Sequence, residues 1–75
     1  MTESELLERL RARRALPPAA ERKRIRTEAG ASLRDVAREV GVSATAVIRW
    51  ERGASPGAKT TAYARLLDEL RRMAT

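Results

Sequence analysis

A short stretch in the second half of the chain carries the side chains best suited to chemistry with a polyanion. Val47 and Trp50 lie three residues apart, as on one face of an α-helix. Because successive residues of a helix are rotated by about 100°, the opposite face can be assigned. It carries Thr45, Ile48, Arg49 and Arg52. These side chains are small, methyl-bearing or cationic, so the face has the shape and chemistry to enter a DNA major groove about 12 Å wide.

The residues around this stretch predict two short helices joined by a tight turn. Ser32 is followed three residues later by Asp35, which is the spacing of a helix-capping pair. Gly41 breaks that helix, and Ser43 can cap the next one. The residues expected in the core of this unit are Val36, Ala37, Val40, Val42, Val47 and Trp50.

Two further helices are predicted before this pair. Thr2 and Glu5 have the spacing of a capping box, and residues 3–15 are expected to form the first helix. Its apolar face carries Leu6, Leu7 and Leu10. The Pro17-Pro18 pair ends this helix and starts another from about residue 18 to 29, because proline suits only the first turn of a helix.

A last helix is predicted after a loop. Residues 53–57 are Gly-Ala-Ser-Pro-Gly, a composition typical of loops, and Thr60 or Thr61 can open a helix over residues 60–75. Apolar side chains then recur at spacings of three and four, at Tyr63, Leu66, Leu67, Leu70 and Met73. No segment shows the alternation of apolar and polar residues that is typical of a β-strand. The expected fold class is therefore all-α, a small bundle of about five helices.

The composition excludes most catalytic chemistry. The 75 residues contain no cysteine and no histidine, which removes the commonest metal ligands and the commonest general base. Sixteen Lys and Arg against ten Asp and Glu give a net charge of +6, so the protein attracts polyanions. We therefore expect a binding protein and not an enzyme, with no catalytic residue, metal, cofactor or small-molecule ligand.

The segment from Ile25 to Pro56 resembles the helix-turn-helix family of phage repressors and Cro-like proteins, often called the XRE type. The spacing of Ala37, Gly41 and Val47 carries much of the resemblance. The closing Trp50-Glu51-Arg52-Gly53 carries the rest. The resemblance covers under half of the chain.

This resemblance implies a lambda-repressor-like bundle. In it, residues 32–40 form the positioning helix and residues 43–52 the recognition helix. We expect a single domain over the whole chain. Its parts are an extra N-terminal helix over residues 1–16, a DNA-binding core over 18–56 and a C-terminal helix over 60–75.

The resemblance also implies roles for individual residues on the recognition helix. Ala44, Thr45 and Arg49 stand where members of the family touch base edges. Arg49 could donate to O6 and N7 of guanine. Ala44 and the methyl group of Thr45, together with Ile48, could contact thymine methyl groups.

Other matched positions imply contacts with phosphates and one internal ion pair. Ser43, at the start of the recognition helix, is placed for a phosphate, and Arg52 and Lys59 for the backbone beyond it. Arg26 and Glu51 match a pair that joins the first helix of the core to the end of the recognition helix, a structural role.

The sequence departs from the family pattern at two positions. A DNA-contacting glutamine is common where this chain has Leu33, and Arg34 is the residue that could replace its contact. An apolar core residue is common where this chain has Arg22. Ala19 and Ala20, or the extra first helix, could fill the space.

Two surfaces have alternative interpretations. The leucine face of the first helix could pack on the last helix within one molecule, or these surfaces could meet across a two-fold axis in a homodimer. The basic segment from residue 9 to 26 has eight cations against Glu21 alone. It could be a second electrostatic patch, but we favour solvated helix faces for most of it.

The expected function is sequence-specific binding of double-stranded DNA by an autonomous transcriptional regulator or phage-type repressor, which acts by occupying its site. An excisionase-like or architectural accessory factor and an antitoxin-like protein-interaction module are the alternatives. With no apolar stretch near the roughly 20 residues that cross a bilayer and no signal peptide, we expect no membrane contact and a cytoplasmic location, in a bacterial nucleoid or a phage-infected host.

Overall fold

Prolines and glycines divide the chain into helices close to the predicted positions. The computed structural model describes residues 3–74, and that part contains five α-helices, one 3-10 turn and no strand. They are α1 (Glu3–Ala15), α2 (Ala19–Glu28), α3 (Leu33–Val40), α4 (Ala44–Glu51), η1 (Gly57–Lys59) and α5 (Thr60–Met73). The predicted all-helical fold is confirmed. The predicted Thr2 cap of α1 and the last residue of the predicted C-terminal helix lie outside the described residues.

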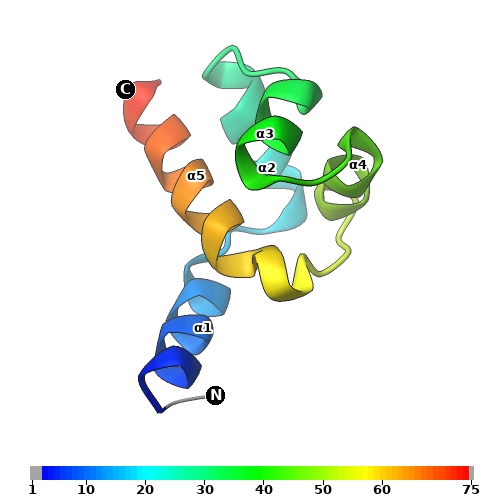
Figure 1. Cartoon of the computed structure of the whole chain (residues 1–75). Helices are drawn as coiled ribbons and strands as arrows, with labels where there is room; N and C mark the ends of the chain where they lie inside the picture. Colours follow the sequence, from blue (N-terminus) through cyan, green and yellow to red (C-terminus); the bar gives the residue numbers. More distant parts are fainter. Residues whose placement is uncertain (1–2, 75) are drawn as a thin grey trace.

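Helix α5 is the element on which the others assemble. It packs against α1, α2 and α3, while α4 packs against α2 and α3 (Figure 1). Tyr63 and Leu67 of α5 are 1% and 2% exposed and lie in the middle of the core. The other core side chains are Ile25, Val36, Ala37, Val40, Val47, Trp50 and Leu70. Val42 is half buried and packs against this core.

The start of α5 differs in detail from the prediction. It begins at Thr60, as expected, but it follows directly on η1, and no side chain caps it. The Thr60 hydroxyl instead donates to the carbonyl oxygen of Gly57 at 2.8 Å. The geometry of the preceding turn therefore starts this helix, in place of a capping threonine.

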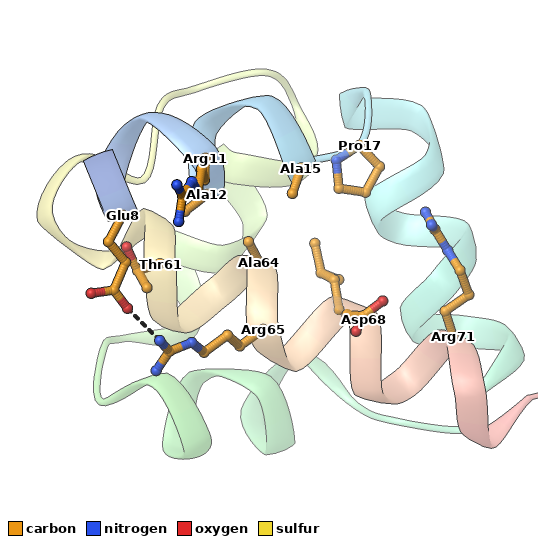
Figure 2. A pocket seen from close by; sticks show the side chains of 11 residues that line it. Glu8, Arg11, Ala12, Ala15, Pro17, Thr61, Ala64, Arg65, Asp68 and Arg71 are labelled. Carbon is orange, nitrogen blue, oxygen red and sulfur yellow. Dashed lines mark hydrogen bonds and ion pairs between the residues drawn. The ribbon is translucent and has the colours of Figure 1, made fainter. Parts of the chain in front are cut away.

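Helix α1 packs on α5 through the side opposite its leucines. Its Glu8 is paired with Arg65 of α5. Figure 2 shows the groove between the two helices, with Ala12 and Ala15 on one wall and Ala64 on the other. The leucine face of α1 stays 44–47% exposed. The interpretation that these leucines pack on α5 within one molecule is therefore wrong, because the side of α1 turned toward α5 carries Glu8, Ala12 and Ala15.

Met73, the last member of the apolar series on α5, lies outside the core. Its side chain is 73% exposed, whereas Leu70, one turn earlier, is 8% exposed. The final turn of α5 projects past the core, so the apolar periodicity continues beyond the point where other helices cover it (Figure 1).

Tyr63 has a hydroxyl group that is buried without a hydrogen-bond partner among residues 3–74. Its ring packs on Trp50, with the ring centroids 4.7 Å apart. Burial, followed by the negative charge of Glu51, raises the pKa of Tyr63 to about 12, although Arg22 and Arg26 oppose the shift. The folded state therefore favours the neutral phenol more strongly than the unfolded state does.

We expect this tyrosine, the only one in the chain, to titrate near pH 12 when folded and near pH 10 when unfolded. The unfolded chain loses its proton first, so the contribution of Tyr63 to stability is complete below about pH 10 and is lost as the pH rises to about 12. Phenolate absorbance, recorded with and without urea, measures both pKa values.

Tyr63→Phe is the matched control for this titration. It should remove the absorbance change and the associated alkaline loss of stability. Because it also removes an unpaired buried hydroxyl, its free energy of unfolding at neutral pH should rise by about 1 kcal/mol. A folded protein that titrates with the pKa of free tyrosine would contradict the buried position.

Candidate nucleic-acid interface

The turn between α3 and α4 sets the position of α4. Gly41 adopts the left-handed conformation, with φ of 83° and ψ of 41°, which costs a glycine little. Its amide and that of Val42 both donate to the carbonyl oxygen of Ala37, at 2.8 and 2.9 Å. Ala37 is 4% exposed, and its small side chain lets α3 and α4 pack closely at this turn. The chain thereby passes from α3 into α4 over three residues.

Both helices of this pair begin at a serine cap. Ser32 Oγ accepts from the Asp35 amide at 3.0 Å, and Asp35 Oδ2 accepts from the Ser32 amide at 2.8 Å. These hydrogen bonds to the carboxylate lower the pKa of Asp35. Ser43 Oγ accepts from the Ala46 amide at 3.2 Å. The two predicted helix starts are confirmed, and α4 is capped at the end that follows the turn.

The inner face of α4 is anchored in the core. Val47 is 0% exposed and Trp50 is 6% exposed, and the Trp50 ring packs on Tyr63. Because these two anchors lie three residues apart on a helix of eight residues, they fix its rotation about its own axis. The opposite face must then lie at the surface.

A buried ion pair holds the C-terminal end of α4. Arg26 of α2 donates to Glu51 from Nε at 2.5 Å and from Nη2 at 3.0 Å, and its Nη1 donates to the carbonyl oxygen of Ala31 at 3.1 Å. The two charged side chains are only 10% and 8% exposed. The hydrogen bonds with Glu51 raise the pKa of Arg26, against the opposing effect of burial. The contact ties α2 to α4 across 25 residues of sequence.

The outer face of α4 is open, although its four predicted base-contacting residues are not equally accessible. Thr45 and Arg49 are exposed, and Arg49 makes no ion pair with any residue in the described part of the chain. Ile48 is half buried. Ala44 is also half buried and packs against the core, so only part of its methyl group faces outward.

The predicted phosphate-contacting residues lie around this face. Arg34 of α3, Arg52 at the end of α4 and Lys59 of η1 are all exposed. The Lys59 ammonium lies beside the turn, since a Cβ at Gly41 would stand 3.8 Å from Lys59 Nζ. The fold thus brings a cation from the loop after α4 next to the turn before α4, and the hydroxyl hydrogen of Ser43 remains free to donate there.

A family model described as Helix-turn-helix matches residues 23–61, a segment that includes α3, the turn, α4 and η1. The chain belongs to the helix-turn-helix family, of the XRE and Cro-like type. This family consists of DNA-binding regulatory domains, so family membership indicates DNA binding. No curated protein and no solved structure matches the chain significantly.

Arg22, just outside the matched helix-turn-helix segment, has a structural role that the sequence did not indicate. Its Nη1 donates to the carbonyl oxygen of Trp50 at 2.9 Å, and its Nε donates to that of Pro17 at 2.7 Å. A cation is favoured at the carbonyl end of a helix, here α4. Ala20 is exposed and so does not fill this space, in which the guanidinium itself lies.

The second departure from the helix-turn-helix pattern is Leu33, which stands where a DNA-contacting glutamine is common, and its packing explains it. It is half buried and packs against the core, whereas the next residue, Arg34, is exposed. The position where relatives carry a DNA-contacting glutamine is therefore used here for packing.

Within residues 3–74 no helix is long and apolar enough to span a bilayer. In the same part of the chain, no three His, Cys, Asp or Glu side chains come together as metal ligands would.

Proposed function

We propose that the protein is a transcriptional regulator of the phage-repressor type that binds duplex DNA sequence-specifically, with residues 43–52 in the major groove. The observation that supports this most strongly is the fixed rotation of α4. Val47 and Trp50 are buried, which leaves Thr45 and Arg49 exposed on the opposite face. An element that projects donor and methyl groups from a rigid scaffold meets the requirement for reading base edges.

The proposed base contacts divide by chemistry. Arg49 pairs with O6 and N7 of a guanine, because its planar guanidinium can donate two parallel hydrogen bonds. Thr45, Ile48 and the accessible part of Ala44 contact thymine methyl groups. Ile48 and Ala44 contribute less than Thr45, because both are half buried.

The proposed phosphate contacts orient the domain on the duplex. Ser43 donates its hydroxyl hydrogen, and Arg34, Arg52 and Lys59 neutralise phosphates on either side of the groove. The Arg26–Glu51 pair keeps the end of α4 in place and does not touch DNA. Regulation then follows from occupancy of the site, since no step of this mechanism requires a reaction. The division into an N-terminal addition over residues 1–16, a core over 18–56 and a last helix over 60–75 belongs to this proposal.

We also propose that the protein binds DNA as a homodimer. The leucine face of α1 supports this, because Leu6, Leu7 and Leu10 stay nearly half exposed on the side turned away from α5. Apolar groups grouped on one helix face favour a partner surface, and the same face of a second copy would meet it in a two-fold arrangement. A dimer of this kind reads two half-sites related by an inverted repeat.

The test is selection of binding sites from a random duplex pool, followed by titration of the best site at several salt concentrations. If each protomer neutralises about five phosphates, the logarithmic slope of affinity against salt should be about −4 to −5 per protomer. Selection should enrich an inverted repeat.

Two outcomes of this experiment would contradict parts of the proposal. Failure to enrich any sequence would remove sequence-specific recognition by α4. Enrichment of a single, unrepeated half-site would remove the homodimer and leave the recognition helix in place.

A further inference from the structure

Helix α1, which precedes the segment shared with the family, carries two arginines next to the loop that follows α4. Arg9 and Arg13 are one helical turn apart and therefore lie on the same face. Together they line a hollow whose other walls are Gly57, Ala58, Thr60 and Thr61, from η1 and the start of α5. No acidic side chain of the described residues lines it.

Both arginines are available for a ligand. They are exposed, and neither forms an ion pair with any residue between 3 and 74. Glu5 and Glu8 line an adjoining hollow, which shares Arg9 and Thr61 with this one, and Glu8 is already paired with Arg65. The hollow beside η1 therefore combines two guanidinium groups that form no ion pair among the described residues with the hydroxyl group of Thr61, which suits a phosphodiester oxygen. The hydroxyl group of Thr60 already donates to the carbonyl oxygen of Gly57.

The position of this hollow relates it to the proposed DNA contacts. Lys59 lies between Ala58 and Thr60 in the chain, and its ammonium reaches the turn before α4. A duplex that contacts Lys59 while α4 occupies its groove passes along η1. The arginines of α1 border the same segment of chain.

We propose that Arg9 and Arg13 form a second phosphate-binding surface, through which α1 binds the DNA backbone beyond the base pairs that α4 contacts. This inference rests on the proposed DNA-binding function. Arg34, Arg52 and Lys59 supply three of the roughly five neutralised phosphates that set the salt slope. Arg9 and Arg13 supply the other two. They add affinity without adding sequence information, because phosphates are the same at every base pair.

The test compares two double variants of the full chain that lose the same charge from the same helix. Arg9→Gln/Arg13→Gln removes the proposed surface. Arg11→Gln/Arg14→Gln is the matched control, because these arginines lie on a different side of α1, and Arg11 lines the groove toward α5. Glutamine keeps the helix propensity close to that of arginine, and circular dichroism verifies that both variants fold.

We expect the first variant to reduce the magnitude of the salt slope by about 1.8 per protomer and to lower affinity by about 10- to 100-fold near 0.1 M salt. The loss should be equal for the selected site and for a random duplex. The control should keep the wild-type slope.

Equal losses in the two variants would overturn the inference, because they would show only an effect of net charge. An unchanged slope in Arg9→Gln/Arg13→Gln would overturn it as well. In both cases the wild-type protein still prefers its selected site, so the function proposed for α4 stands. If the wild-type protein shows no such preference, the proposed function itself fails.

Discussion

Replacing Glu51 with glutamine is expected to lower the free energy of unfolding by about 3 kcal/mol. The carboxylate accepts two hydrogen bonds from Arg26 where both side chains are about nine-tenths buried. Glutamine offers the guanidinium only neutral carbonyl oxygens, its own and that of Ala31, and no negative charge to compensate the buried cation. A domain of 75 residues has a total stability of only about 4 to 11 kcal/mol, so the loss is a large fraction of it.

Urea denaturation followed by circular dichroism measures this effect, and the chain offers a matched control. Glu21 pairs with Arg24 at 3.4 Å on the surface, where the side chains are 45% and 60% exposed. Glu21→Gln should change the free energy of unfolding by less than about 0.5 kcal/mol, because an exposed pair contributes little.

A second variant separates the loss of the pair from the burial of an isolated charge. Arg26→Met/Glu51→Met removes both charges and should be much closer to wild type than Glu51→Gln, since no uncompensated charge remains. If Glu51→Gln and Glu21→Gln cost the same small amount, the pair at the end of α4 does not have the structural role assigned to it.

Arg49→Ala is expected to weaken binding to the selected DNA site by about 5- to 160-fold, which corresponds to the loss of one bidentate contact with guanine. The affinity for random duplex should fall much less, because only the phosphate contacts determine it. Arg49 is exposed and has no ion-pair partner among the described residues, so the stability of the domain should change by less than about 0.5 kcal/mol.

The control for this prediction is Arg72→Ala, which removes the same charge from the last turn of α5, away from α4 (Figure 1). It should leave the preference for the selected site unchanged. Equal binding by Arg49→Ala and wild type would remove the assignment of α4 as a recognition helix and would favour the antitoxin-like alternative. A circular-permutation mobility assay on the same complexes tests the architectural alternative, for which the duplex is strongly bent.

Local chemistry was sufficient to predict the helices and the two faces of α4. The Pro17-Pro18 pair and Gly41 end helices because of their own backbone restrictions, and serine caps act within three residues. Likewise, the spacing of Val47 and Trp50 sets the outward position of Arg49 by helix geometry alone. The Arg26–Glu51 ion pair could be predicted only from the resemblance to a known family, because its two residues are 25 positions apart in the sequence.

The tertiary structure decided which surfaces meet. An apolar face indicates that a helix has a partner, but its periodicity does not say which neighbour covers it. The alanines of α1, and not its leucines, therefore line the groove toward α5, and Met73 lies past the core. Arg22 reaches a carbonyl group 28 residues away, and no local signal marks that contact.

The amino-acid sequence by itself determined that the chain is helical, where its turns lie and which side of α4 faces outward, because each of these depends on residues within one or two helical turns. Only the tertiary structure placed Lys59 beside Gly41 and the arginines of α1 beside η1. Those contacts join segments separated by long stretches of chain. They arise from how the helices pack as a whole, which no single stretch of sequence encodes.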